Sequence, residues 1–213
     1  MAESLSDRCR RLAEPLLNRT ASVLAGMGVT PNILTGIGII PYLLVAWLLF
    51  YGHNLAAALV LMVFAPLDVV DGTLARMTGQ ESDFGAFLDS TVDRIEEIIM
   101  YGALLAHLVH FHQDVLLTAM LVLAALTGSL MVSYTRARAE GLGYECDVGL
   151  LTRFERMVLF ILALITEWYE PLLGIIALLS YFTTFQRIMA VYRQAERRSE
   201  DAGQGAEELG RDR

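Results

Sequence analysis

Residues 68–93 read DVVDGTLARMTGQESDFGAFLDSTVD and lie between two apolar segments of the chain. Asp68 and Asp71 are three residues apart and Asp89 and Asp93 are four apart, so each pair lies on one face of a helix. We expect an antiparallel hairpin that turns near residues 79–82, with Asp68 and Asp71 near the C-terminal end of its first helix. The hairpin would place Asp71 level with Asp89, and Asp68 level with Asp93. The sequence therefore predicts four carboxylates that face one another between two helices.

Those four carboxylates need a cation to neutralise them. An ionisable group inside a membrane span costs at least about 2.5–3.5 kcal/mol. Carboxylate oxygens with no His or Cys close to them in the sequence select hard cations such as Mg²⁺, Mn²⁺ or Ca²⁺. Gly72, Ala75 and Gly85 leave the helix surfaces bare for a flat or bulky ligand, and Arg76 adds a cation that can bind a phosphate. The pattern is typical of a metal-dependent phosphate-transfer site.

The composition predicts an all-α integral membrane protein. Of the 213 residues 55% are hydrophobic, and the mean hydropathy is +0.49. Several apolar segments are long enough to cross about 30 Å of hydrocarbon at about 1.5 Å per residue. We expect six transmembrane helices, at residues 32–51, 54–76, 84–108, 114–136, 153–168 and 170–192.

The arginines predict the orientation, because positive residues accumulate in cytoplasmic loops. The chain contains no Lys, so every positive side chain apart from His is an Arg. The loops at 51–54, 107–114 and 166–171 contain no Arg, whereas the alternate loops and both ends of the chain do. We therefore expect a multi-pass protein of the cell membrane, with both termini and residues 68–93 on the cytoplasmic side.

The chain divides into three segments. Residues 1–29 combine arginines with apolar residues at nearly helical spacing, which indicates an amphipathic helix at the membrane surface. Residues 30–193 form the membrane domain. Residues 194–213 have almost no large apolar residues and are expected to be disordered. The net charge of −8 comes largely from the aspartate cluster and this tail, and we expect no nucleic-acid partner. Both cysteines fall on the predicted cytoplasmic side, where thiols stay reduced.

A second cluster of arginines follows the fourth predicted helix. Arg136 and Arg138 end that helix, Arg153 and Arg156 begin the fifth, and Arg187 lies in the sixth. Arg136 and Arg138 also fit the ordinary pattern in which positive residues flank the cytoplasmic end of a transmembrane helix. Arg187, however, is embedded among apolar residues and is costly there without an anion. Several arginines beside a metal site favour an acceptor substrate that itself carries phosphate.

The chain resembles the CDP-alcohol phosphotransferases. Residues 68–93 match their signature D-x2-D-G-x2-A-R-x8-G-x3-D-x3-D at every position, and the resemblance extends from residues 30–32 to residues 186–187. It implies six transmembrane helices with a juxtamembrane amphipathic helix, a homodimer, and two divalent ions, Mg²⁺ or Mn²⁺. It also implies a role in phospholipid biosynthesis, in which a phosphatidyl-type group passes from a CDP-linked lipid to an alcohol and CMP is released.

The resemblance also implies roles for individual residues. Asp68, Asp71 and Asp89 would be metal ligands, and Asp93 would both bind metal and act as the catalytic general base. The residues that would contact the CDP-linked lipid are Asn32, Thr35, Asp68, Asp71, Gly72, Ala75, Arg76 and Gly85.

Three segments resemble the branch of the family that uses inositol phosphate, found in actinobacteria and archaea. These are residues 85–94, 133–140 and 153–156. The likeness implies 1L-myo-inositol 1-phosphate as acceptor and CDP-diacylglycerol or CDP-archaeol as donor. Bacterial members usually have Lys where this chain has Arg136, while archaeal members more often share the Arg. The residues that would bind the acceptor phosphate are Ser133, Arg136, Arg138, Arg153, Arg156 and Arg187.

Two other functions stay open. The same transfer to glycerol 3-phosphate or another polar alcohol is the alternative reaction, although glycerophosphate-using relatives commonly have Lys where this chain has Arg94. A membrane transporter or cation channel is the alternative class of protein, because acids within spans also mark ion paths. Transport predicts charges through the whole bilayer depth and often repeated halves. Here the acids and arginines gather at one face, and the sequence has no visible half-repeat.

Overall fold

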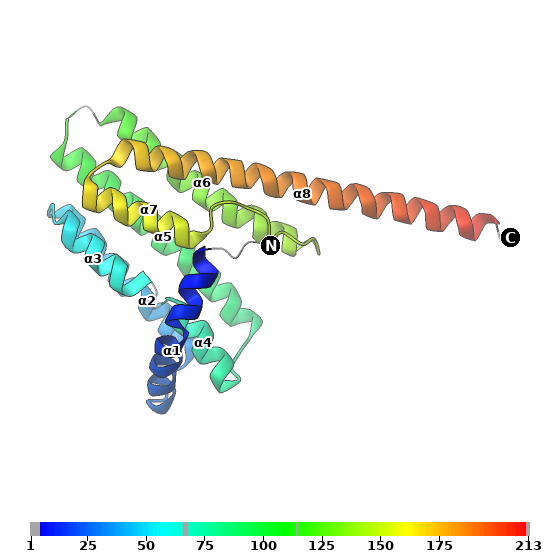
Figure 1. Cartoon of the computed structure of the whole chain (residues 1–213), viewed down its shortest axis with the longest axis horizontal. Coiled ribbons are helices and arrows are strands. Elements are labelled where there is room, and N and C mark those ends of the chain that lie inside the picture. Colours follow the sequence, from blue (N-terminus) through cyan, green and yellow to red (C-terminus); the bar gives the residue numbers. More distant parts are fainter. Residues whose placement is uncertain (1–4, 66–67, 114, 212–213) are drawn as a thin grey trace.

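The computed structural model describes residues 5–65, 68–113 and 115–211, and this part of the chain is entirely helical apart from its connecting loops (Figure 1). Side chains are described for residues 15, 17–65, 70–113 and 115–200. The all-α class predicted from the sequence is confirmed. The helices are α1 (Leu5–Gly26), α2 (Pro31–Phe50), α3 (Asn54–Phe64), α4 (Asp68–Thr78), α5 (Asp83–Phe111), α6 (Leu116–Glu140), α7 (Arg153–Thr166) and α8 (Tyr169–Arg211).

Within the described residues, three helical segments are long and apolar enough to cross a membrane. They are α2, α6 and residues 169–200 of α8, and α3 is a shorter apolar helix. Their large apolar side chains are exposed along much of their length, as expected where lipid replaces water as the surrounding solvent. The count of six spans stays a prediction.

The second predicted span, residues 54–76, falls on two described helices. They are α3, which ends at Phe64, and α4, whose described residues begin at Asp68. The sequence has a proline at position 66, which lies outside the described residues. Helix α4 carries both Asp68 and Asp71, and it ends at Thr78, just before the turn that the sequence predicts near residues 79–82.

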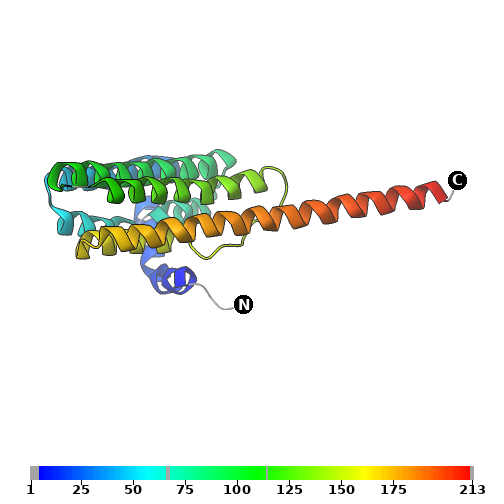
Figure 2. The same ribbon diagram turned by 90° about the horizontal axis from the view of Figure 1, so that it is seen from above.

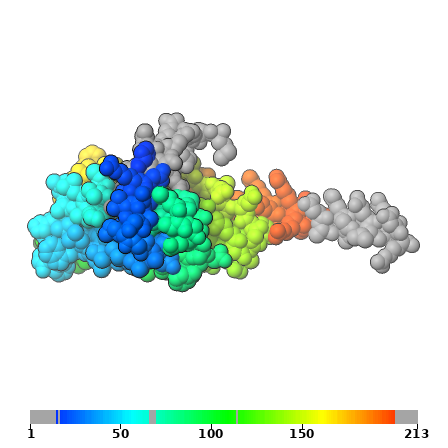
Figure 3. Space-filling view, turned by 90° about the horizontal axis from the view of Figure 1, so that it is seen from below, coloured from blue at the N-terminus to red at the C-terminus, as the bar shows by residue number. Residues whose placement is uncertain are grey.

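A small apolar cluster joins α1 to α4. Leu17 and Ala21 of α1 are buried against Val70 and Leu74 of α4. In Figure 3 the described side chains of α1 form part of the molecular surface, with α2 and α3 on one side and α4 and α5 on the other. The N-terminal helix thus forms as predicted, and it supports the short helix that carries Asp71.

The main core is formed by helices α2, α3, α5, α6, α7 and α8. Tyr101 and Phe160 pack edge to face at its centre, with their ring centroids 5.1 Å apart. Leu104, Leu164 and Leu173 are fully buried around them. This core fixes the rotation of α5, and so it fixes the direction in which the acidic face of α5 points.

Helix α8 extends far beyond the other helices (Figure 2). It includes residues 194–211, which we expected to be disordered, so the structure differs from that prediction. Many of these residues are Ala, Glu, Gln and Arg, which have high helix propensity. Local helix propensity therefore favours a helix in this segment.

Helices α6 and α8 approach each other most closely at Gly128. A Cβ atom at this position would lie 3.0 Å from the Cβ of Ser180 and 3.5 Å from the ring of Tyr181. The hydroxyls of Thr127 and Tyr181 are 2.9 Å apart beside it. Small residues let membrane helices pack closely in this way.

Replacing Gly128 with Leu is expected to separate α6 from α8 and to destabilise the fold by about 1–3 kcal/mol, as overpacking does. For a domain of this size the melting temperature in detergent should fall by about 2–4 °C for each kcal/mol. Gly102→Leu is the matched control, because nothing lies within 4 Å of a Cβ atom at Gly102. Equal melting temperatures for the two variants would contradict the close packing at Gly128.

Candidate functional site

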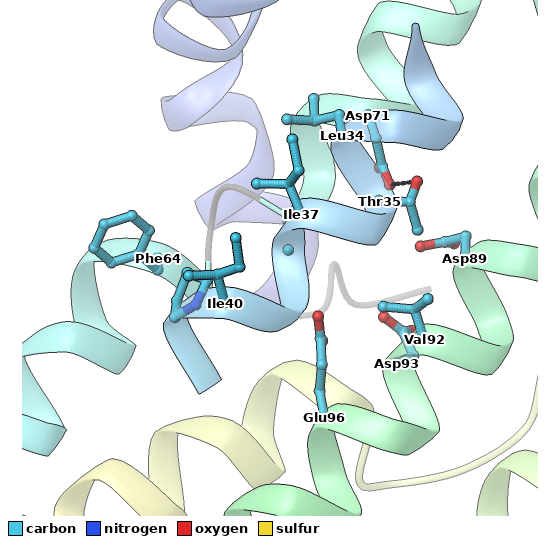
Figure 4. Close-up of a pocket in the computed structure, with 12 residues that line it drawn as sticks. Leu34, Thr35, Ile37, Ile40, Phe64, Asp71, Asp89, Val92, Asp93 and Glu96 are labelled. Atoms are coloured by element: carbon cyan, nitrogen blue, oxygen red, sulfur yellow. Dashed lines mark hydrogen bonds between the residues drawn. The ribbon is translucent and has the colours of Figure 1, made fainter. Parts of the chain in front are cut away.

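A cavity of about 260 Å³ lies between α2, α4 and α5, and three of the four carboxylates predicted from the sequence line one side of it. Asp71 comes from α4, and Asp89, Asp93 and Glu96 come from α5 (Figure 4). The rest of the wall is mostly apolar and is formed by Leu34, Thr35, Ile37, Gly38, Ile40, Pro41, Phe64 and Val92. The cavity therefore has one acidic side and one side suited to hydrocarbon.

Asp71 is buried and held by two hydrogen bonds. Thr35 of α2 donates its hydroxyl to Asp71 Oδ2 at 2.5 Å, and the Gly72 amide donates to Asp71 Oδ1 at 2.6 Å. Thr35 is one of the predicted donor-lipid contacts, and its position beside Asp71 brings two predicted site residues together. These hydrogen bonds fix the carboxylate at the cavity wall.

Asp93 forms ion pairs with two arginines. Its Oδ1 atom is 2.6 Å from Arg153 Nη1, and its Oδ2 atom is 3.3 Å from Arg94 Nη2. Arg153 also reaches Glu96, with 2.5 Å between Nη2 and Oε2. The guanidinium of Arg153, the first residue of α7, therefore bridges two carboxylates of α5 that line the cavity.

Glu96 is the site residue that the sequence reasoning missed. Its side chain is 2% exposed, and it lines the cavity beside Asp93. A signal was available in the spacing, because residues 89, 93 and 96 follow one helical face at i, i+4 and i+7. The family signature ends at Asp93, about one helical turn before Glu96, and so it does not include Glu96.

The donor atoms fit a hard divalent cation, although the described carboxylates do not complete a metal cage. Asp71, Asp89 and Asp93 offer only oxygen, which Mg²⁺ and Mn²⁺ prefer. Among the residues whose side chains are described, no three His, Cys, Asp or Glu side chains form a group that could hold an ion. The side chain of the fourth predicted ligand, Asp68, lies outside the described part, so the predicted cage of four carboxylates stays a prediction.

Small residues lie where the sequence predicts a nucleotide. A Cβ atom at Gly85 would be 3.2 Å from Ser82 Oγ and 3.3 Å from Asn32 Oδ1, so Gly85 and Asn32 lie together. Arg76 is exposed and donates to Thr73 Oγ1 at 3.2 Å, and a Cβ atom at Gly72 would be 3.6 Å from its Nη1 atom. The half-buried Ala75 precedes it. This surface combines small residues with an exposed cation.

The predicted acceptor-binding arginines fall into two groups. Arg156 and Arg187 are 3% and 7% exposed and are engaged by protein groups. Arg156 donates to Glu97 Oε1 from Nη2 at 2.7 Å and from Nε at 3.2 Å. Arg187 donates to the carbonyls of Val148, at 3.0 Å, and Val132. Both side chains therefore connect helices and loops within the protein.

The other predicted acceptor-binding residues are more accessible. Arg136 and Arg138 are exposed at the end of α6. Arg136 forms ion pairs with Glu140 at 2.7 Å and with Asp147 at 3.2 Å. Ser133 donates to the carbonyl of Ser129 at 3.3 Å. Together with Arg153, the exposed arginines offer positive charge at the same end of the bundle as the carboxylates.

Comparisons with known proteins agree with this site. The sequence profile of the CDP-alcohol phosphatidyltransferase family matches residues 28–186. The archaetidylinositol phosphate synthase of Pyrococcus horikoshii is 37% identical over 182 residues, which cover 84% of this chain and 93% of that protein. The phosphatidylinositol phosphate synthase of Corynebacterium glutamicum is 35% identical over 156 residues, which cover 73% and 71%.

Solved structures of one protein show the same architecture. The phosphatidylinositol phosphate synthase of Mycobacterium tuberculosis with CDP-DAG bound has a TM-score of 0.77 and 29% identity, covering 84% of this chain and 94% of that one. Its complex with manganese and citrate has a TM-score of 0.76 and 30% identity, covering 83% and 88%.

The apolar helices and these relatives thus identify a multi-pass membrane transferase. The chain belongs to the CDP-alcohol phosphatidyltransferase family, since the family profile covers most of its length.

Arg156→Ala is expected to destabilise the protein by about 3–5 kcal/mol, because it removes both hydrogen bonds to Oε1 of the buried Glu97 carboxylate, although Arg94 stays 3.3 Å from Oε2. The double variant Arg156→Met/Glu97→Leu removes both charges and should recover much of that loss. Thermal unfolding in detergent measures both effects. If Arg156→Ala melts like the wild type and only weakens binding of a phosphorylated acceptor, Arg156 belongs to the acceptor site instead.

Proposed function

We propose that this protein transfers a phosphatidyl-type group from a CDP-linked lipid to 1L-myo-inositol 1-phosphate and releases CMP. The observation that carries the proposal is the cavity with two unlike sides. The signature aspartates 71, 89 and 93 line one side, and apolar side chains of α2 form most of the other. Such a cavity suits a substrate with a charged diphosphate and hydrocarbon chains.

The carboxylates would hold the metal ions that such a transfer needs. The four predicted ligands are Asp68, Asp71, Asp89 and Asp93, and the expected ions are two Mg²⁺ or Mn²⁺. The related Mycobacterium tuberculosis enzyme has been crystallised with manganese, and the all-oxygen donor set of this chain suits the same ions. Bound there, they would neutralise charge that develops on the CMP leaving group.

Other residues of the chain would have separate roles in the reaction. The Asp93 carboxylate would accept the proton of the attacking acceptor hydroxyl, since a positioned carboxylate is an effective general base. Gly72, Ala75 and Gly85 would leave room for the nucleotide, and the exposed Arg76 would bind its phosphates. Arg153 contacts Asp93 directly, so an anionic group bound by Arg153 would lie next to the base. This contact explains how an acceptor phosphate could bring its hydroxyl to Asp93.

Inositol 1-phosphate is favoured as the acceptor for two reasons. The Pyrococcus and Corynebacterium relatives are named as synthases of inositol phosphate lipids, and the chain matches most of their length. Arg136 and Arg138 are exposed at the end of α6, and Arg153 begins the next helix, α7. The two exposed side chains provide positive charge for a phosphate. We assign the direct phosphate contacts first to Arg136, Arg138 and Arg153. The resemblance adds Ser133, Arg156 and Arg187, although these two arginines are buried.

Two further proposals concern the setting of the enzyme. The arginine-free loops at 51–54, 107–114 and 166–171 favour an orientation with both termini and the cavity on the cytoplasmic side. The family resemblance favours a homodimer in the bilayer. Both agree with a reaction that draws its acceptor from the cytoplasm and its donor from the membrane.

An assay of the purified protein tests the acceptor. CDP-diacylglycerol and Mn²⁺ are supplied with inositol 1-phosphate, inositol or glycerol 3-phosphate, and both CMP and the lipid product are measured. We expect lipid product and CMP with inositol 1-phosphate, and almost none with inositol, which lacks the phosphate. Product from glycerol 3-phosphate alone would support the alternative transfer. Absence of CMP with every acceptor, when CDP-archaeol also fails as donor, would remove the enzyme proposal in favour of a transporter or channel.

Asp93→Asn is expected to lower kcat by about 10²–10⁴-fold, because the amide cannot accept the hydroxyl proton. The apparent affinity for the CDP-linked lipid should change much less, since the other carboxylates remain. Asp83→Asn is the matched control, because Asp83 is an exposed carboxylate in the first turn of the same helix. Full turnover by Asp93→Asn would show that another group takes the proton.

A further inference from the structure

The segment that joins α6 to α7, residues 141–152, lies along α8, and we call it the strap. It begins just after Arg136 and Arg138 and ends just before Arg153. The strap therefore connects the exposed arginines of α6 with the arginine that contacts Asp93. Figure 2 shows it running beside α8 before the chain enters α7.

Two side chains of α8 hold the end of the strap next to α7. The hydroxyl of Thr183 accepts from the amides of Leu150 and Leu151, both at 3.3 Å. Arg187 donates from Nε to the carbonyl of Val148 at 3.0 Å. Thr183 is fully buried, so these contacts are shielded from water.

Two more side chains hold the end of the strap next to α6. The amide group of Gln194 makes a paired contact with the backbone of Glu145, accepting from its N–H at 3.1 Å and donating to its carbonyl at 2.7 Å. The Arg198 guanidinium lies over the ring of Tyr144, 5.1 Å from the centroid. Both side chains lie beyond residue 186, where the match to the family profile ends.

These four contacts form one continuous stripe on α8. Positions 183, 187, 194 and 198 are separated by four, seven and four residues, which keeps them on one helical face. Their partners run in the opposite order, from Leu150 back to Tyr144. The strap is therefore docked along its length in one register, antiparallel to α8.

Gly149 shows how closely the strap fits. Its φ angle is +145°, and a Cβ atom there would lie 2.5 Å from Thr183 Cγ2. Any other residue would clash with Thr183 and adopt a backbone conformation that L-residues avoid. The docked position thus depends on a glycine at this point.

The docked strap also reaches the proposed acceptor site. Asp147, in the middle of the strap, forms an ion pair with Arg136 at 3.2 Å. Arg153 follows the strap directly and contacts Asp93 and Glu96. The strap therefore contacts Arg136 through Asp147 and leads directly into Arg153.

We propose that Gln194 is a positioning residue of the acceptor site: by docking the strap on α8, it holds Arg136 and Arg153 at the spacing that one acceptor phosphate requires. This inference rests on the proposed function and extends it to a part of α8 outside the family match. Gln194 acts through the strap and touches neither substrate. Loss of its two hydrogen bonds should therefore loosen the strap and weaken acceptor binding while the donor side is unaffected.

Cys146 provides a probe of the strap that does not depend on activity. It lies next to Glu145 and is 2% exposed, and burial raises the pKa of its thiol even though Arg187 and Arg136 lower it. The sequence contains one other cysteine, Cys9, so Cys9→Ser leaves a single thiol. In that background the docked strap should make Cys146 react slowly with a maleimide.

The test compares three variants in the Cys9→Ser background of the full chain. For Gln194→Ala we expect maleimide labelling of Cys146 to be at least about fivefold faster, and the KM for inositol 1-phosphate to rise about fivefold to tenfold, as loss of two hydrogen bonds implies. The KM for the CDP-linked lipid should not change. Gln194→Glu keeps the acceptor for the Glu145 amide and loses the donor, so its effects should be intermediate. Arg193→Ala is the matched control on the exposed face and should behave as the wild type.

Each result decides the proposal. Unchanged labelling in Gln194→Ala would show that Gln194 does not dock the strap. Faster labelling with an unchanged acceptor KM, or with equal rises in both KM values, would show that docking does not position the acceptor site. If the wild type fails to use inositol 1-phosphate, the proposed function is overturned and this proposal with it, while the labelling rates still show whether Gln194 holds the strap.

Discussion

The structure depends on keeping several carboxylates together at one end of an apolar helix bundle. Like charges in such a setting repel strongly unless other groups neutralise them. Part of the neutralisation comes from the protein. The acids Asp93, Glu96 and Glu97 are matched by Arg94, Arg153 and Arg156 in one connected network of ion pairs. That network contains three acids and three arginines, and Asp71 and Asp89 add two further carboxylates to the cavity wall. Divalent cations at those carboxylates would complete the balance.

The parts of the fold around the cavity can be understood from that constraint. Helix α4 places Asp71 at the cavity wall. Helix α1 packs on α4 through Leu17 and Ala21 and holds it in place. Thr35 of α2 donates to Asp71 and fixes that carboxylate at the cavity wall. The strap then ties the acceptor-side arginines to α8. Each element contributes to one arrangement of charge, in which a diphosphate and a phosphorylated alcohol can meet beside Asp93.

Much of this arrangement could be predicted from local sequence patterns. The helical class, the small residues at the predicted nucleotide site and the acidic face of α5 all follow from spacing along single helices. The pairs that join distant helices could not be predicted this way. Glu97 and Arg156 are 59 residues apart, and their meeting depends on how α5 and α7 are rotated by packing. The same applies to Glu145 and Gln194, 49 residues apart.

The central claim is that the aspartates between α4 and α5 form a divalent metal site. Titration of purified protein with Mn²⁺, followed by electron paramagnetic resonance of the free ion, measures this directly and needs no turnover. We predict saturable binding of two Mn²⁺ per chain in the presence of a CDP-linked lipid, displacement by Mg²⁺, and loss of binding in Asp71→Asn/Asp89→Asn, with Asp83→Asn as the control. Absence of saturable binding in the wild type, or unchanged binding in the double variant, would contradict the account.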